Sequence, residues 1–375
     1  MPRRIRSTTT AAALSALLGI ALLSAGVVPA GAAPPSDETV TVATGLNNPR
    51  QLSVGPGQAL YIAEAGVATD CTPIPGAPPE FQVCGLTGSV TEVSRDGQRR
   101  VVTGLPTMDF GGEVIGASDV AVRGNRIAVL TGGLAAASTA RDSLPEQYAA
   151  FGTLRTGDLR AAPLTGADLT LEADALAYEV EVNPDGNQPP DSNAVGFTSL
   201  GGDRWAIVDA GGNTLLRMGD GAESTIAVLP NGEPVPNPFG PGMIPPQAVP
   251  TDVAIGPDGA YYVSQLTGFP FPTGGSSIWR ITADGEASVY ATGLTMVTSL
   301  AWRGDTLYAV QLDDANFFDG HIGSLREVIP GGSEHEAVVD GLSAPYGVAI
   351  HGHWAYVTVD SVSSGDGSVI RVDLR

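Results

Sequence analysis

The sequence predicts an all-β protein, a β-propeller of six blades, because one pattern recurs six times. Each recurrence has alternating residues that end in apolar side chains, then a short glycine-containing turn, then a second apolar run. The recurrences begin at residues 50–54, 118–122, 196–200, 251–255, 298–302 and 346–350. Because each blade stacks only on its neighbours, a repeat protein of this length needs no division into several domains.

The first unit shows the four strands expected of one blade. They are predicted at 51–54, 59–63, 88–94 and 99–102. The first two strands are separated by the turn Gly55-Pro56-Gly57, and the last two by the hairpin turn Arg95-Asp96-Gly97. The fourth unit repeats this order with similar turns.

The two ends of the propeller are expected to meet in one sheet. The sixth unit reaches only its third strand, residues 368–373, and residues 38–44 form a strand that precedes the first unit. We therefore expect the N-terminal strand to complete the last sheet. Closure of this kind removes exposed strand edges, which otherwise promote aggregation.

Long insertions are expected on one face only. They follow the second strand or the fourth strand of a unit, at 65–87, 132–151, 266–276 and 312–323, and at 104–117, 161–195 and 228–250. Both kinds of connection leave the same face of a four-stranded blade, so this loop-bearing face is the functional candidate. Within one insertion, residues 168–180 indicate a short helix or an additional strand.

The first 32 residues are predicted to be a signal peptide. Arg3, Arg4 and Arg6 precede an apolar stretch at 11–28, and Ala30-Gly31-Ala32 provides small residues for cleavage after Ala32. An uncleaved membrane anchor is the alternative, because an apolar stretch of this length is borderline for crossing a bilayer. We expect a secreted protein in which residues 33–375 form the single propeller domain.

The chain is strongly acidic, with a formal charge of −21 and no lysine. Loss of the three N-terminal arginines would make it more negative still. Such a surface repels nucleic acid and anionic lipid, so we expect neither nucleic-acid nor membrane binding by the mature protein, and we expect a monomer. The acidity favours cations as ligands, although it also serves solubility in exported proteins.

The only two cysteines, Cys71 and Cys84, flank the proline-rich segment 72–79. In an oxidising compartment a pair at this spacing is expected to form a disulfide. Closing so short a loop contributes about 3 kcal/mol in the chain-entropy model.

Three stretches resemble the ScyD/ScyE family of exported propellers. They are residues 249–272, residues 183–186 with 191–193, and residues 209–216, and the phrase 267–272 (Thr-Gly-Phe-Pro-Phe-Pro) is the most specific of them. The resemblance extends over essentially the whole mature chain. It implies an exported six-bladed propeller, similar in fold to NHL-repeat and gluconolactonase-like proteins, and it implies no particular activity.

Carboxylate and amide side chains are expected to gather at the mouth of the central channel, where second strands end and first strands begin. Such oxygens suit a hard cation such as Ca²⁺, and Glu64, Asn193 and Asp209 are the predicted ligands. Gluconolactonase-like propellers hold a metal with a similar set, but here Thr251-Asp252 stands where Pro-Asp-Gly is expected. The alternative is that these side chains bond to one another and to water.

Gln265, Gln311, Asp360, Phe269 and Phe271 are the residues expected on the ligand-binding face. Together with other aromatic residues of the insertions, the two phenylalanines predict an apolar rim around an acidic centre. The alternative is that the aromatic side chains fasten the long loops to one another.

Three functions remain open from the sequence. The first is an exported protein that binds a small molecule or an extracellular partner on the loop-bearing face, with Ca²⁺ in the channel. The second is a metal-dependent hydrolase resembling a lactonase, with Asp119 or Asp252 as the base. The third is a structural protein of the cell envelope with no small-molecule site.

Overall fold

A computed structural model describes residues 39–315 and 320–375. In this part of the chain, six sheets with four antiparallel blade strands follow one another along the sequence. Blade 1 comprises β2 (Pro49–Val54), β3 (Leu60–Glu64), β6 (Gly88–Ser94) and β7 (Gly97–Leu105). Blade 2 comprises β10 (Ala117–Arg123), β11 (Arg126–Thr131), β12 (Thr153–Asp158) and β14 (Thr170–Asp174). Blade 3 comprises β15 (Ala194–Gly201), β16 (Arg204–Asp209), β17 (Thr214–Met218) and β18 (Ser224–Val228).

The remaining three blades have the same order, with the inner strand first. Blade 4 comprises β21 (Pro250–Ile255), β22 (Tyr261–Gln265), β23 (Ser276–Ile281) and β24 (Ala287–Leu294). Blade 5 comprises β25 (Val297–Arg303), β26 (Thr306–Gln311), β27 (Ile322–Val328) and β28 (Glu336–Ser343). Blade 6 comprises β29 (Val348–His351), β30 (Trp354–Val359), β31 (Ser364–Asp373) and β1 (Thr39–Asn47). The fourth strand of blade 6 is thus the first strand of the chain.

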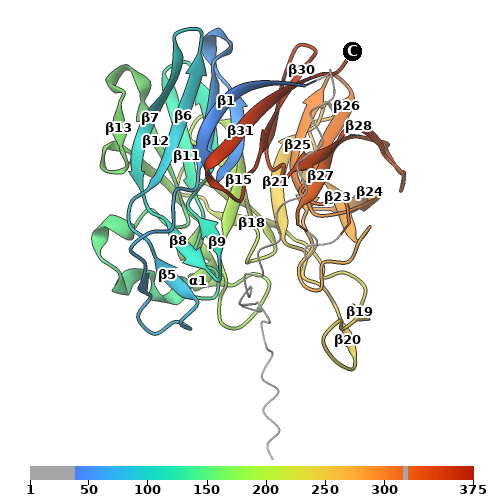
Figure 1. Cartoon of the computed structure of the whole chain (residues 1–375). Helices are drawn as coiled ribbons and strands as arrows, with labels where there is room; N and C mark the ends of the chain where they lie inside the picture. The colour runs from blue at the N-terminus through green and yellow to red at the C-terminus, as the bar shows by residue number, and fades with distance from the viewer. Residues whose placement is uncertain (1–38, 316–319) are drawn as a thin grey trace, which may run out of the picture.

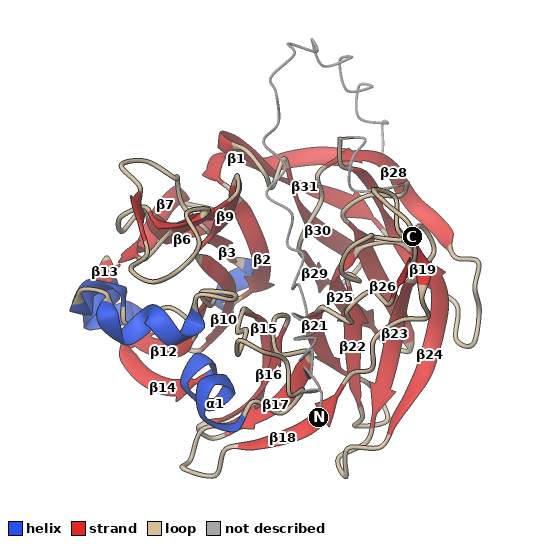
Figure 2. Ribbon diagram, turned by 90° about the horizontal axis from the view of Figure 1, so that it is seen from below, coloured by secondary structure: helices blue, strands red, loops and turns tan. Residues whose placement is uncertain are grey.

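The sheets form a ring around a central axis (Figure 2). The inner strands contact one another in the order β2, β10, β15, β21, β25 and β29, and β29 contacts β2 again. Strand β1 pairs antiparallel with β31, so that Thr39 lies opposite Val372 and Leu46 opposite Gly367. The predicted β-propeller, and the pairing of its N-terminal strand with the last sheet, are confirmed.

Apolar side chains between neighbouring blades form the core. Between blades 2 and 3, for example, Leu130 and Leu154 pack with Ile207 and Leu216, all fully buried. Successive residues of a strand face opposite neighbours: Ile127 of β11 packs toward blade 1, whereas Leu130 packs toward blade 3. The period-two alternation therefore supplies both interfaces of a sheet. The ring therefore holds most of the insertions at one end of the blades; the exception is the connection between β12 and β14 of blade 2.

The insertions of blade 1 build a small sheet of their own. Strands β4 (Thr72–Pro73), β5 (Phe81–Val83), β8 (Met108–Phe110) and β9 (Glu113–Ile115) join residues from two insertions that the sequence indicated as loops. In Figure 1 this sheet lies at the lower ends of the blades, on the same side as the hairpin of β19 (Val235–Pro236) and β20 (Met243–Ile244).

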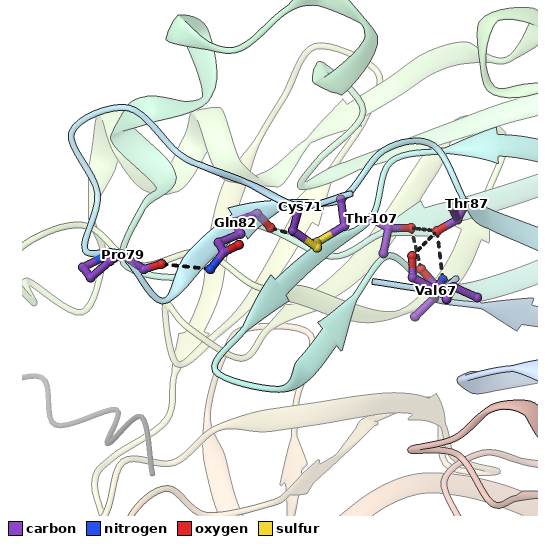
Figure 3. Close-up of a disulfide and its surroundings, with 8 residues drawn as sticks. Val67, Cys71, Pro79, Gln82, Thr87 and Thr107 are labelled. Carbon is purple, nitrogen blue, oxygen red and sulfur yellow. Dashed lines mark hydrogen bonds between the residues drawn. A yellow bond between two sulfur atoms is a disulfide. The ribbon is translucent and has the colours of Figure 1, made fainter. Parts of the chain in front are cut away.

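The predicted disulfide between Cys71 and Cys84 is present beside this small sheet (Figure 3). A threonine pair stands next to it: the Thr87 hydroxyl donates to Val67 O at 2.9 Å, and the Thr107 hydroxyl donates to Ala65 O at 2.8 Å. The cross-link and these hydrogen bonds secure a segment that has little regular structure.

The insertion expected at 161–195 needs correction, because the outer strand of blade 2, β14, lies inside it. The connection between the third and fourth strands of this blade is therefore long. It includes β13 (Leu164–Thr165), which pairs parallel with β7 of blade 1. The sequence signal was weak because β14 is largely exposed, with one buried residue, Ala173.

Helix α1 (Ala175–Val182) follows β14 directly, so residues 168–180 contain both a strand and a helix. The Asp174 carboxylate begins the helix by accepting a hydrogen bond from Ala177 N at 2.9 Å. Within 39–315 and 320–375, every helix is too short or too polar to cross a membrane. The expected signal peptide and the aromatic residues Phe317 and Phe318 lie outside the described residues.

Candidate functional site at the channel mouth

One residue in or directly before each inner strand occupies an equivalent position around the channel, immediately before the apolar residue from which the strand continues in regular register. These residues are Gln51, Asp119, Gly196, Asp252, Ser299 and Gly347. Several of their side chains bind the backbone of the next blade: Asp119 accepts from Phe197 N at 2.9 Å, and Asp252 from Leu300 N at 2.8 Å. The polar ring thus ties neighbouring blades together.

Asp119 and Asp252, the two candidate bases, are both buried. Burial raises the pKa of Asp119 well above its usual range, and the charge of Asp252 raises it further. Burial also raises the pKa of Asp252 to about 6, against the lowering effect of its hydrogen bonds. Each carboxylate also accepts from the backbone of the residue that follows it, at 2.7 Å in both cases. Fixed N–H groups thus already engage both oxygens of each candidate base.

Arg50 and Tyr346 stand one residue above this ring, at the mouth of the channel. Arg50 is buried, with its guanidinium carbon 5.0 Å from the centre of the Tyr346 ring. It donates to two carbonyl oxygens, Ser361 O at 2.6 Å and Val114 O at 2.7 Å. The arginine thereby holds β9 and the loop after β30 over the mouth. Among the described residues, no carboxylate lies within 4.0 Å of this guanidinium.

A cavity of about 30 Å³ opens at this mouth, lined by Arg50, Glu113, Ser118, Asn193 and Tyr346 among others. This volume admits roughly two water molecules or one small ion. Glu113 keeps access to solvent, yet protein surrounds its carboxyl group, and desolvation raises its pKa while Arg50 lowers it. The enclosed part of the mouth can therefore hold water or a single small group.

Two of the predicted metal ligands, Asn193 and Asp209, lie together. The Asp209 carboxylate is fully buried and accepts from Asn193 N at 2.7 Å and from the Ser192 hydroxyl at 2.6 Å. It also accepts from the backbone of Gly211 and Gly212, each at 3.1 Å. Burial raises the pKa of Asp209, and these donors act in the opposite direction.

The third predicted ligand, Glu64, has other partners. Its buried carboxylate forms an ion pair with Arg100 at 3.0 Å and accepts from Asn47 N at 2.7 Å and from the Ser89 hydroxyl at 3.1 Å. It shares no hydrogen-bond partner with Asp209. In the described part of the chain, no three His, Cys, Asp or Glu side chains are assembled as a metal centre.

The residues predicted for the ligand-binding face divide into two groups. Gln265 and Gln311 are buried: the Gln265 amide oxygen accepts from the Trp279 indole at 3.1 Å, and that of Gln311 accepts from Thr295 N at 2.8 Å. Both amides therefore form hydrogen bonds inside the protein, at the strand ends where the insertions begin. Asp360 is partly buried and begins the loop after β30 in a left-handed conformation, with φ of 53°.

The second group consists of aromatic side chains at the surface. Phe269 stacks on Phe239 of the β19–β20 loop with ring centres 5.8 Å apart, and it meets Phe271 edge-on at 6.1 Å. We call Phe239, Met243, Phe269 and Phe271 the aromatic cluster. Phe239 and Met243 are 58% and 59% exposed. By contrast, Phe110 is buried against Phe81 at 4.5 Å in the small sheet, so there the aromatic residues fasten loops together.

The sequence did not indicate Arg50, Glu113 or Tyr346 as residues of the mouth. A signal for two of them was present, because Arg50 and Tyr346 precede the ring position of the first and last repeats. Alignment of the six repeats by register, rather than by their apolar residues alone, would have placed both at the channel.

Comparisons with known proteins support the fold. No family model and no curated protein matches the chain. A gluconolactonase from Xanthomonas campestris is 12% identical with a TM-score of 0.53, covering 93% of this chain and 94% of its own. A glucose dehydrogenase is 14% identical with a TM-score of 0.51, covering 89% and 98%. A virginiamycin B lyase from Staphylococcus aureus is 13% identical with a TM-score of 0.46, covering 90% and 99%.

The ring of sheets, together with the similarity to the gluconolactonase and the glucose dehydrogenase, defines the class of protein as a β-propeller. At identities this low the similarity establishes the fold alone, because propellers with one architecture host unrelated activities.

Proposed function

We propose that this protein is an exported propeller of the ScyD/ScyE type that binds a ligand or an extracellular partner on its loop-bearing face. The sequence pattern of residues 1–32 and the Cys71–Cys84 disulfide support export, since disulfides persist in oxidising compartments. The motifs at 183–193, 209–216 and 249–272 support the family. The aromatic cluster is the observation that carries the binding function.

The aromatic cluster combines residues from two insertions that are separate in the sequence, 228–250 and 266–276. Two of its large apolar side chains are more than half exposed, although burying such groups stabilises a folded protein by about 25 cal/mol per Å². Grouped exposed apolar side chains on a soluble protein mark interaction sites. Aromatic side chains are also enriched among the residues that dominate binding energy.

The charge of the protein restricts the chemistry of the partner. A formal charge of −21 favours the approach of a neutral or positively charged molecule. We therefore propose a partner that presents an apolar group in a neutral or basic setting.

The geometry favours binding over hydrolysis. The candidate bases Asp119 and Asp252 are engaged by backbone N–H groups, and the cavity above them measures about 30 Å³. Similarity to a gluconolactonase supports the fold and carries no substrate to this chain. A hydrolase would need a substrate cleft at the mouth, where Arg50 holds β9 instead.

Titration with Nile red, a neutral apolar dye, tests the binding surface. We expect saturable fluorescence with the unaltered protein and a loss of at least about half of the signal in the double variant Phe239→Ser, Met243→Ser. Val289→Ser is the matched control, because this exposed side chain belongs to the outer strand β24. Equal dye binding by the double variant and the control would overturn the proposal.

A lactone hydrolysis assay with added calcium tests the enzymatic alternative. The binding proposal expects no turnover above the spontaneous rate. Turnover that Asp252→Asn abolishes, in a protein that remains folded, would establish the hydrolase instead.

A further inference from the structure

A second acidic group lies behind Asn193, between helix α1 and the end of β16. Its centre is the Gly211-Gly212 turn, whose two N–H groups donate to Asp209. A Cβ atom at Gly211 would lie 2.3 Å from Asp191 Oδ1, and one at Gly212 would lie 2.6 Å from Glu179 Oε2. Gly211 is restricted to glycine because the backbone oxygen of Asp191 would also lie 2.7 Å from its Cβ, whereas at Gly212 the Glu179 carboxylate fills the space that a side chain would take.

Glu179 is the unusual member of this acidic group. Its side chain is fully buried, and within the described residues neither carboxylate oxygen has a hydrogen-bond partner. The Thr214 hydroxyl is also buried without a partner, and it lies 3.5 Å from the same Gly212 Cβ position. The amide oxygen of Asn183, at the end of α1, is a fourth buried oxygen without a partner in the described part of the chain.

The charges around Glu179 are all of one sign. Burial, followed by the charges of Asp209, Asp185 and Asp191, raises the pKa of Glu179 to about 8. Burial and the charges of Asp209 and Asp185 raise the pKa of Asp191 to about 7. The chain has no lysine, and in the described part no arginine lies within 4.0 Å of Glu179, Asp191 or Asp209. An uncompensated buried charge is costly, so proteins pair such groups or use them to bind metal ions.

We infer that a divalent cation, Ca²⁺ by its ligand chemistry, binds between α1 and blade 3, with Glu179 and Asp191 as carboxylate ligands. The hydroxyl of Thr214 and the amide oxygen of Asn183 add neutral oxygens. Asp209 keeps its hydrogen bonds to the backbone and contributes negative charge from the other side of the glycine turn. Asp185 also contributes negative charge, and its carboxylate accepts a hydrogen bond from the Asn213 side-chain amide at 2.9 Å.

The ligand chemistry selects calcium among the common metals. All the proposed donors are oxygen atoms, which argues against zinc. Carboxylate and amide oxygens supplied by the protein are typical of Ca²⁺, whereas Mg²⁺ usually keeps several water ligands. Only two of the proposed ligands are carboxylates, which agrees with the lack of an assembled three-residue His, Cys, Asp or Glu centre in the described residues. Carbonyl oxygens and water complete such sites.

This site is distinct from the expected channel site, because it omits Glu64 and places the ion behind Asn193. It is also independent of the proposed partner binding at the aromatic cluster. A bound cation would join α1, which follows blade 2, to the turn that ends β16 in blade 3. It would thereby fix the segment that carries Asn193 at the channel mouth.

Isothermal titration calorimetry of the purified protein with CaCl₂, after removal of divalent ions with a chelator, tests the site. We expect one saturable site, and in Glu179→Gln an affinity lower by at least about tenfold. Glu181→Gln is the matched control, because Glu181 lies on the same helix and is exposed. Asp191→Asn is a second variant that should lose binding in the same way.

Thermal unfolding separates loss of the site from loss of the fold. Calcium should raise the Tm of the unaltered protein and of Glu181→Gln, and leave that of Glu179→Gln unchanged. Without calcium, Glu179→Gln should melt no lower than the unaltered protein, because the amide keeps the size of a buried side chain that has no hydrogen-bond partner among the described residues. The inference is overturned if the unaltered protein binds no calcium at millimolar concentration, or if Glu179→Gln binds it as tightly as Glu181→Gln.

Discussion

The closing strand provides the sharpest test of the architecture, through the substitution Leu46→Ala. Leu46 of β1 is fully buried and packs in a cluster with Leu52, Leu60 and Ile62 of blade 1. Truncation of a fully buried leucine to alanine costs about 2–5 kcal/mol, because it removes apolar contact and leaves a cavity. We expect a loss of about 3 kcal/mol in the free energy of unfolding, which for a domain of this size lowers Tm by about 4 °C.

Urea denaturation followed by tryptophan fluorescence measures this loss. Val40→Ala is the matched control, because Val40 belongs to the same strand and is 49% exposed. Its effect should stay within about 0.5 kcal/mol. Equal and small losses for the two variants would refute the reasoning, since β1 would then contribute no buried contact that the ring depends on.

Three further perturbations should give measurable effects. Arg100→Ala leaves the buried Glu64 carboxylate without its ion-pair partner, and urea denaturation should show a loss of about 1–3 kcal/mol, the lower end reflecting the partial exposure of Arg100. Folding raises the pKa of Asp252 to about 6, above the value of about 4 in the unfolded chain. Protonation of Asp252 therefore contributes its full stabilisation below about pH 4, and this stabilisation is lost as the pH rises through 6. Asp252→Asn should remove that part of the pH dependence of urea denaturation, and an unchanged profile would contradict the assignment. Replacement of both Cys71 and Cys84 by serine should lower the free energy of unfolding by about 3 kcal/mol if the small sheet unfolds together with the ring. If the small sheet unfolds separately, differential scanning calorimetry should show an additional transition at a lower temperature.

Most of the ring could be predicted from the sequence because its strands obey one rule. Alternating side chains face the two neighbouring blades, so the inner strand predicted at 51–54 lies within β2 (Pro49–Val54). The strand predicted at 38–44 corresponds to β1 (Thr39–Asn47) for the same reason. An additional strand was one possibility for residues 168–180, but its place as the outer strand of blade 2 escaped prediction because only one residue of β14 is buried. The small sheet escaped prediction because its strands have two or three residues each.

The acidic group around Gly211-Gly212 could be predicted only in part. Residues 183–186, 191–193 and 209–216 stood out by the family resemblance, and Asp209 also by its place at a strand end. Glu179 had neither signal, because it lies on a helix thirty positions earlier than Asp209 in the chain. Only the packing of α1 against blade 3 brings its carboxylate to the glycine turn. Contacts of this kind depend on the path of an insertion, which no local pattern in the sequence encodes.

The pairing of β1 with β31 also has a consequence for how the chain reaches its native state. The first strand has no partner until residues 364–373 have been synthesised, so the ring is among the last features to form. Contacts between such distant segments slow folding, because a long loop must close before they are made. A chain whose last sheet cannot close until its final strand emerges keeps its two ends unpaired during synthesis, which is compatible with the export proposed above.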